Sequence, residues 1–178
     1  MQSPNDILPH VLARLTVERY IAEGLTIQAP ADPHGVLAER AGAFVTIRDR
    51  AGCLRGCIGT IQPVCATVAD EIINNAISAA TRDPRFPMIS SSELLDLVYG
   101  VDVLSPPEPA SLQELDPSTF GVIIEALNGH QRALLLPGIN GIDTAEQQWR
   151  AVHIKAGIKE GTPIRIERFT VRRYGKDG

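Results

Sequence analysis

The sequence contains no apolar run long enough to cross a membrane. The longest apolar stretches, residues 122–124 and 133–136, fall far short of the roughly 20 residues that a spanning helix needs. The first residues, Met1-Gln-Ser-Pro-Asn-Asp, have neither the basic segment nor the apolar segment of a secretory signal. We therefore expect a cytoplasmic protein without a membrane span.

Cysteine is scarce, with three residues in a chain of 178. An odd number, in a chain long enough to bury a core without bridges, favours free thiols in a reducing compartment. The spacing of Cys53, Cys57 and Cys65 fits neither paired zinc ligands nor the C-x3-C-x2-C run of a radical SAM cluster. We expect no metal centre and no cofactor.

The motifs of several large enzyme classes are also missing. The sequence has no Walker A loop, no G-x-G-x-x-G and no G-x-S-x-G, which disfavours ATP hydrolysis, dinucleotide binding and serine hydrolysis. Seventeen basic residues against 21 acidic ones leave a net charge of −4. That balance argues against affinity built on neutralising many phosphates, so nucleic acid is an unlikely partner.

The pattern of the first half predicts two helices around a hairpin. Ser3-Pro4 is typical of a helix start, and Gly24 of its end, with an apolar face formed by Ile7, Leu8, Val11, Leu12, Leu15 and Ile21. The β-prone runs 43–48 and 54–61 flank a polar turn that contains Gly52, which indicates a hairpin. Apolar residues at helical spacing predict a second helix within 64–82, ended by Pro84.

The second half predicts strands with one further helix. A short turn at 92–95 and a strand at 97–104 precede a proline-rich break at 106–109. Asn128-Gly129 predicts a two-residue type I′ turn between the strands 120–127 and 131–136. Capping-box spacing from Asp143 to Glu146 opens a helix that ends at Gly157. The alternation of the last strand, 164–174, changes phase after Ile166, which indicates a bulge or a change of buried face. The expected class is α+β.

The segment Leu54-Arg-Gly-Cys-Ile-Gly59 is unusual, because two glycines interrupt a β-prone run. Glycine in a strand marks a bulge or the close approach of another group. One interpretation is that Gly56 and Gly59 present Cys57 as a reactive or ligand-contacting thiol beside Arg55, whose charge favours the thiolate. The other is that Cys57 fills a tight space in the core.

Two further charge patterns each have two interpretations. The first pattern is Asp83-Pro-Arg85. One interpretation is that Arg85 recognises a carboxylate or phosphate while Asp83 orients the guanidinium. The other is that Asp83 and Arg85 only fix the loop at the end of the helix. Residues 91–125 carry seven acidic residues and no lysine or arginine, whereas the last 14 residues are basic. One interpretation is that both segments are solvated faces of strands. The other is that an anion-binding edge is formed by Arg165, Arg168, Arg172 and Arg173.

An ordered set of motifs carries a family resemblance. The blocks Gly42-Ala-Phe-Val-Thr-Ile47, Leu54-Arg-Gly-Cys-Ile-Gly-Thr60, Asp83-Pro-Arg-Phe86, Val101-Asp-Val-Leu-Ser105, Leu134-Leu-Leu-Pro137 and Lys155-Ala-Gly-Ile158 occur in order. In this the chain resembles the AMMECR domain family, whose bacterial and archaeal members are called AmmeMemoRadiSam system protein A. The match is best over 40–175, within a single domain of that type over 1–178 that begins with a helix in 1–24.

The resemblance implies a fold and a setting, and it implies no particular reaction. It implies a two-lobed α+β domain, mainly antiparallel sheet flanked by helices, with Leu54–Gly59 lining a cleft between the lobes. It also implies association with Memo-like and radical SAM proteins. We expect an accessory protein that binds a small molecule or a partner through Arg55, Gly56, Gly59, Asp83 and Arg85. The alternatives are a thiol-dependent enzyme with Cys57 as catalytic nucleophile and a nucleic-acid-associated regulator.

Overall fold

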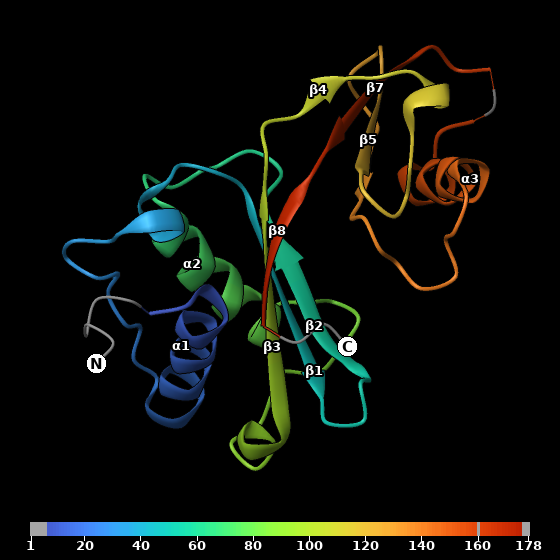
Figure 1. The fold of residues 1–178 in the computed structure, drawn as a ribbon. Coiled ribbons are helices and arrows are strands. Elements are labelled where there is room, and N and C mark those ends of the chain that lie inside the picture. Colours follow the sequence, from blue (N-terminus) through green and yellow to red (C-terminus); the bar gives the residue numbers. More distant parts are fainter. Residues whose placement is uncertain (1–6, 160, 176–178) are drawn as a thin grey trace. The chain divides into compact units, whose positions relative to one another are not determined.

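The computed structural model describes residues 7–159 and 161–175. The chain forms two compact units (Figure 1). Unit 1 contains the residues up to Val103 together with those from Arg172, and unit 2 is Leu104–Val171. Each unit has its own antiparallel sheet and its own hydrophobic core.

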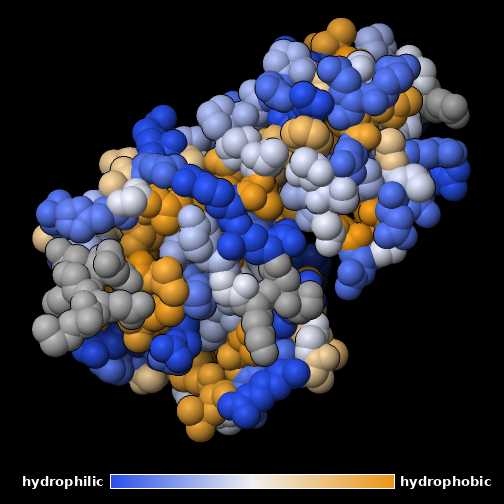
Figure 2. All heavy atoms as spheres, in the orientation of Figure 1, coloured by the Kyte–Doolittle hydropathy of each residue, from blue (hydrophilic) through white to orange (hydrophobic). Residues whose placement is uncertain are grey.

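Unit 1 is a four-stranded sheet, in the order β2-β1-β3-β8, with two α-helices packed together over it (Figure 1). Its elements are α1 (Pro9–Glu23), η1 (Gly35–Ala38), β1 (Ala43–Asp49), β2 (Leu54–Gly59), α2 (Val68–Thr81), η2 (Leu94–Asp96), β3 (Leu97–Leu104) and β8 (Val171–Gly175). The helices bury their apolar faces against alternate residues of the central strands, of which Val45, Ile47 and Val101 are among the most buried. Apolar surface lies over η2 (Figure 2), where Leu95 is exposed.

The predicted first hairpin and second helix are confirmed. Gly52 has a φ of 87°, and the Asp49 carboxylate accepts a hydrogen bond from the Cys53 N–H at 2.8 Å, which closes the turn between β1 and β2. Thr67 caps α2 by accepting from the Asp70 N–H. The predicted apolar residues of α2, Val68, Ile72, Ile73, Ala76, Ile77 and Ala80, are all buried.

The first helix differs from the prediction at its start and on its buried face. Ser3 lies outside the described residues, but Ile7 and Leu8 are not helical and α1 begins at Pro9. Pro9 suits the first helical position because its missing N–H has no intrahelical acceptor there. The buried side chains are Pro9, Leu12, Ala13, Thr16 and Val17, whereas Leu8 and Leu15 are exposed. The predicted end at Gly24, with φ of 71°, is confirmed.

Unit 2 is a four-stranded sheet, in the order β4-β7-β5-β6, with α3 packed against β5 and β6 (Figure 1). Its elements are β4 (Glu108–Pro109), η3 (Leu112–Glu114), β5 (Gly121–Ala126), β6 (Arg132–Leu135), α3 (Ala145–Ala156) and β7 (Ile164–Phe169). The proline-rich segment does not simply break the sheet, because Glu108 and Pro109 pair with β7 as a two-residue strand.

The hairpin of β5 and β6 is present, but its turn is not type I′. A type I′ turn requires positive φ at both central residues. Gly129 has φ of 74°, and Asn128 is not in the positive-φ region. The Gly129 N–H instead donates to the Ala126 carbonyl at 2.8 Å, and the Ala126 N–H to the Gln131 carbonyl at 2.9 Å. The loop is therefore longer than two residues.

The sequence predicts the start of α3 one residue too early and its end correctly. The capping box pairs Thr144 with Gln147, whose side chain accepts from the Thr144 N–H, rather than Asp143 with Glu146. Gly157 ends the helix with a φ of 64°.

The predicted last strand is two strands that belong to different sheets. β7 ends at Phe169 and belongs to the sheet of unit 2, whereas β8 starts at Val171 and joins the sheet of unit 1. Between them the Thr170 N–H donates to the Ser105 hydroxyl at 3.0 Å, and the Thr170 carbonyl accepts from the Ser105 N–H at 2.9 Å. The phase change in the alternation thus marks the point where the chain leaves one core for the other.

The predicted α+β class, with antiparallel sheets flanked by helices, is confirmed. Within 7–159 and 161–175, none of the helices combines the length and the apolar character needed to cross a membrane.

Candidate functional site

The unusual segment forms β2, which lies at the edge of the unit 1 sheet. Its pairing with β1 shifts register once, because Ile47 faces Gly56 while Arg48 faces Leu54. Arg55 is therefore the extra residue of a β-bulge. Bulges of this kind aim a side chain away from the regular ladder.

The two glycines of β2 are explained by close packing. A Cβ added at Gly56 would overlap the carbonyl oxygen of Ala79 in α2, so only glycine lets that helix approach the strand. A Cβ at Gly59 would overlap the ring of Phe44 and lie 2.6 Å from the Ala43 carbonyl oxygen. The close-approach interpretation of these glycines is correct. Because Gly56 faces α2, Cys57 projects from the opposite face of the sheet.

Cys57 is half-buried and its backbone is held on both sides by one loop. Its N–H donates to a carboxylate oxygen of Asp83 at 2.9 Å, and its carbonyl accepts from the Arg85 guanidinium at 3.2 Å. The sulfur lies 3.3 Å from the Thr46 hydroxyl on the paired strand. The Asp83-Pro-Arg85 segment thus replaces a neighbouring strand at this point of the sheet edge.

Asp83 and Arg85 form the core of the cluster. The Asp83 side chain is 2% exposed and accepts two hydrogen bonds from the Arg85 guanidinium, at 2.9 and 2.7 Å. These bonds, together with those from the Cys57 and Arg85 N–H groups, hold the pKa of Asp83 far below its ordinary value despite burial. Arg85 itself is 55% exposed and packs over the ring of Phe86.

Arg55 pairs with Glu93 rather than with the thiol. Its Nε donates to one Glu93 oxygen at 2.7 Å, its Nη2 lies 2.7 Å from the same oxygen, and the other Glu93 oxygen accepts from the Ser90 N–H at 2.8 Å. The Arg55 hydrogen bond, helped by Ser90, lowers the pKa of Glu93 to about 2. The Arg85 guanidinium, by contrast, does reach Cys57, where it donates to the backbone carbonyl at 3.2 Å.

This ion pair predicts a dependence of stability on pH. The folded pKa of Glu93 is depressed, so its contribution is complete above the ordinary value of 4.5 and is lost as the pH falls towards 2. We expect Glu93→Gln to lower the free energy of unfolding more at about pH 6 than at about pH 2.5. Urea unfolding of both proteins at the two pH values measures this, and equal differences contradict it.

A second buried carboxylate was missed at the sequence level. Glu71, on the first turn of α2, is fully buried. It accepts hydrogen bonds from the Val64 and Cys65 N–H groups and, at 2.8 Å, from the Thr60 hydroxyl. Glu71 therefore ties the loop that leaves β2 to α2. The sequence signal for this buried role was the position of a glutamate among apolar residues at helical spacing.

The four histidines lie in different surroundings. His34 pairs with Asp32 at 3.3 Å, and the His153 ring stacks near Trp149 and contacts its carbonyl at 3.0 Å. Over the described part of the chain, none of them hydrogen-bonds to the Cys57 sulfur, and no group of three or more His, Cys, Asp or Glu side chains is arranged to hold a metal ion.

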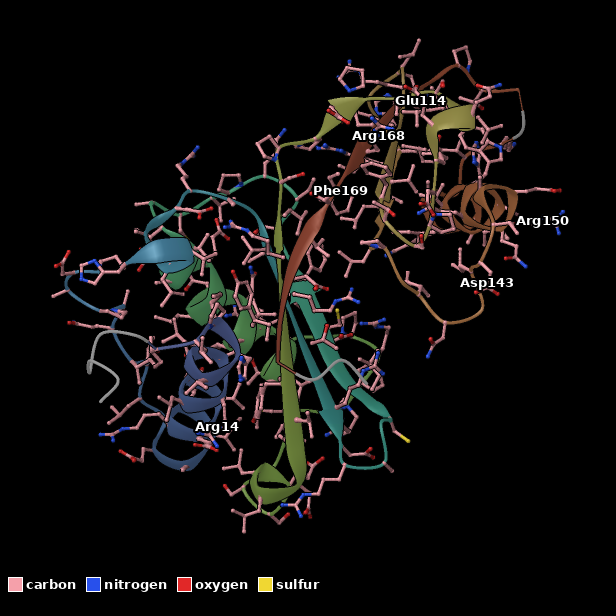
Figure 3. The ribbon with its side chains drawn as sticks, viewed as in Figure 1. Arg14, Glu114, Asp143, Arg150, Arg168 and Phe169 are labelled. Carbon is pink, nitrogen blue, oxygen red and sulfur yellow. The ribbon has the colours of Figure 1, made fainter. Side chains whose placement is uncertain are left out.

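The basic C-terminal residues largely meet acidic ones. Arg168 pairs with Glu108 at 2.7 Å and donates to the Glu114 carbonyl at 3.2 Å (Figure 3). Arg172 pairs with Glu39, and Arg173 with Asp102 at 2.7 Å. Three of the four arginines of the predicted anion-binding edge thus already have carboxylate partners, which favours the solvated-face interpretation.

The cluster therefore brings together three predicted site residues, Cys57, Asp83 and Arg85, and adds Thr46. Arg55 lies two residues away on the same strand, in its own ion pair, and Gly56 and Gly59 serve packing. The cleft that the resemblance implies along Leu54–Gly59 stays a prediction.

One family of known proteins matches almost the whole chain. The model of the AMMECR1 family matches residues 10–175. The chain belongs to the AMMECR1 family, and the match extends further towards the N-terminus than the motifs of residues 40–175 indicated.

Two relatives in sequence and one solved structure are similar to the chain over most of its length. A protein of Thermotoga maritima is 50% identical over 161 residues, covering 89% of this chain and 91% of the relative. A Clostridium acetobutylicum protein is 42% identical over 171 residues, and this chain covers only 36% of it. The crystal structure of an uncharacterised protein from Pyrococcus horikoshii superposes with a TM-score of 0.84 at 30% identity, covering 95% and 90% of the two chains.

Proposed function

We propose that the chain is an accessory binding protein that takes an anionic group, carried by a small molecule or by a segment of a partner protein, at the Cys57–Asp83–Arg85 cluster. The observation that carries this proposal is the asymmetry of the ion pair. Asp83 is 2% exposed while Arg85 is 55% exposed, so a buried carboxylate holds a guanidinium that still faces solvent.

An arginine held in this way is pre-organised for anion binding. Asp83 accepts hydrogen bonds from Nε and Nη2 of Arg85. The guanidinium has five N–H donors, so these two bonds leave other donors to bind an anion. The side chain is already ordered by Asp83, by the Cys57 carbonyl and by the Phe86 ring, so a ligand does not have to order it. The same contacts pin the loop, so both interpretations of Asp83 and Arg85 apply to one arrangement.

The surroundings of the thiol support binding rather than catalysis. A nucleophilic cysteine needs a base within hydrogen-bond reach. In the described residues, the polar partner of the Cys57 sulfur is the hydroxyl of Thr46, which is not a base at neutral pH.

The association with Memo-like and radical SAM proteins is proposed on the family resemblance. The length of the Clostridium relative is compatible with it, since this chain spans about a third of that protein and the family unit there belongs to a longer polypeptide.

The proposal is tested by the rate at which iodoacetamide alkylates each cysteine of the native chain, followed by peptide mass spectrometry. Inorganic phosphate and acetate serve as anion probes, and purified Memo-like and radical SAM proteins of the same organism as partner probes. We expect a probe to slow alkylation of Cys57 and not of the exposed Cys53. Arg85→Gln should abolish this protection, whereas Arg82→Gln, an exposed arginine at the C-cap of α2, should retain it. If no probe protects Cys57, or if Arg85→Gln is protected as well as the natural chain, the proposal is wrong.

A thiol-dependent enzyme is the second candidate, favoured by the contact of the Arg85 guanidinium with the backbone carbonyl of Cys57. A neighbouring cation increases the thiolate fraction. This candidate predicts that Cys57 is alkylated faster than Cys53 in the chain alone and that Arg85→Gln slows it. The binding proposal predicts the reverse order, because Cys57 is half-buried and Cys53 is exposed.

A further inference from the structure

A pocket in unit 2 lies between α3 and the segment 157–164 that leads from α3 into β7. Its volume is about 620 Å³, within the roughly 300–1,000 Å³ typical of small-molecule sites. Most of its wall is apolar or aromatic, formed by Trp149, His153, Ile154, Ile158 and Ile164. All of these residues belong to unit 2, whereas the Cys57–Asp83–Arg85 cluster belongs to unit 1.

An aromatic pair forms one wall of the pocket. Trp149 and His153 lie one turn apart on α3, with ring centroids 4.1 Å apart and ring planes tilted by 58°. Nδ1 of His153 lies 3.0 Å from the Trp149 carbonyl oxygen. A carbonyl oxygen only accepts, so Nδ1 carries the proton, and Nε2 of the neutral ring is left as an acceptor. The contact with Trp149 therefore fixes the tautomer of His153 as well as the position of its ring.

Three lining side chains keep a polar atom that a ligand can reach. These atoms are the indole N–H of Trp149, Nε2 of His153 and the hydroxyl of Thr162, and all three residues are half-buried. Within residues 7–159 and 161–175, none of the three atoms has a hydrogen-bond partner. None is among the unpaired side-chain atoms that the protein buries completely, so each retains accessible surface. The pocket thus offers a donor, an acceptor and a hydroxyl that serves as either.

The charged side chains of the described lining balance each other. Glu146 and Arg150 lie one turn apart at the rim and pair at 3.6 Å, and Arg150 extends from α3 (Figure 3). Both side chains are at least 75% exposed, so water screens their charges and neither provides a strong ionic contact. With a neutral His153, this lining favours an uncharged ligand.

The shape and polarity of a suitable ligand follow from these groups. Aromatic side chains favour planar rings, which they contact by offset stacking or edge to face. A ring with an N–H group and an unprotonated nitrogen donates to His153 Nε2 and accepts from the Trp149 N–H or the Thr162 hydroxyl. Such a ring also fits against the isoleucines of the wall, since its faces are apolar.

We propose that this pocket binds a small, uncharged, planar heteroaromatic molecule, with its ring against Trp149 and its polar edge on His153 Nε2 and the Thr162 hydroxyl. The inference does not depend on the function proposed for the Cys57–Asp83–Arg85 cluster.

The test is a titration of the full chain with adenine at pH 8, where a free imidazole is neutral. Trp149 is the single tryptophan of the sequence, so its fluorescence and its one indole N–H signal in NMR both report on this pocket. We expect saturable changes in both, with a dissociation constant in the roughly millimolar range that suits a ligand of about ten non-hydrogen atoms. Cyclohexanol, which is uncharged but not planar, should bind more weakly than adenine.

Two variants test the polar contacts. His153→Phe keeps a ring and removes the acceptor, and Thr162→Val keeps the side-chain volume and removes the hydroxyl. Each should weaken adenine binding about 3- to 10-fold, the effect of losing one hydrogen bond. If His153→Phe does not fold, Thr162→Val still decides the question, because its hydroxyl has no partner in the described part of the chain.

His130→Phe is the matched control. It is the same chemical change at an exposed histidine of unit 2 that does not line the pocket, so adenine binding should be unchanged. Arg85→Gln should also bind adenine normally, which separates this inference from the proposed function. The inference is overturned if neither Trp149 signal saturates, if folded His153→Phe and Thr162→Val both bind adenine as tightly as the natural chain, or if cyclohexanol binds as tightly as adenine.

Discussion

Replacing Gly56 by alanine is expected to lower the free energy of unfolding by about 3 kcal/mol, at the upper end of the 1–3 kcal/mol typical of overpacking. The added Cβ would overlap the carbonyl oxygen of Ala79, which belongs to the backbone of α2. A side chain in that place could change rotamer, but a helix carbonyl moves only with its helix. The substitution therefore separates α2 from β2 and opens the unit 1 core, and urea unfolding followed by circular dichroism measures the loss.

Gly129→Ala is the control for this substitution. Gly129 has φ of 74° and open space where a Cβ would stand, so the same chemical change there costs only backbone strain, about 1 kcal/mol. If Gly56→Ala is as stable as Gly129→Ala, the close approach of α2 is not what requires glycine in the motif, and a ligand contact at Gly56 becomes the better explanation.

Replacing Glu71 by alanine is expected to cost a similar amount, about 3 kcal/mol. The substitution leaves the Val64 and Cys65 N–H groups and the Thr60 hydroxyl without their acceptor. Water reaches part of the loop, since Val64 is exposed, and that limits the loss. For a chain of this size the thermal midpoint should fall by about 6–12 °C, which calorimetry or thermal circular dichroism measures.

Two variants separate the hydrogen bonds of Glu71 from its charge and from ordinary helix effects. Glu71→Gln keeps one acceptor oxygen and the side-chain volume, so it should fall between the natural chain and Glu71→Ala. Glu23→Ala removes an exposed glutamate of α1 that pairs with Arg19 and should change stability by less than about 1 kcal/mol. A loss for Glu71→Ala no larger than that for Glu23→Ala would show that the loop does not depend on this carboxylate.

These two predictions bear on what the motif does. If both losses of stability are observed, Gly56 and Glu71 serve to pack α2 against β2 and against the loop that follows β2. Cys57 and Arg85 then remain as the groups that face away from this joint, which is where the proposed binding of an anionic group takes place.

Several elements could be predicted from the sequence because the contacts that define them are local. The β1–β2 hairpin depends on Asp49 and Gly52 within its own turn, and α2 depends on the Thr67 cap and on apolar residues at helical spacing. Gly24 and Gly157 end their helices because a left-handed residue is needed at those points. Propensity, spacing and capping were sufficient there.

Other elements were decided by contacts between distant parts of the chain. The Asn128-Gly129 signal is local, yet the loop is longer than a type I′ turn, and the N–H of Leu127 donates to the Pro163 carbonyl. The buried face of α1 differs from its apolar pattern because the packing against α2 selects Leu12, Ala13 and Val17. The phase change after Ile166 was visible, but its cause, a strand that passes from one sheet to another at Thr170, was not.

The candidate site divides in the same way. The sequence by itself determined which residues are the candidates, Cys57, Asp83 and Arg85, and indicated that glycine at 56 and 59 allows a close approach. Only the tertiary structure decided that Asp83 and Arg85 clasp the backbone of Cys57, that Arg55 pairs with Glu93, and that Glu71 is buried. The physical reason is that hydrogen bonds and ion pairs depend on distances of about 3 Å, and residues far apart in the chain acquire such distances only when helix, strand and loop are packed together.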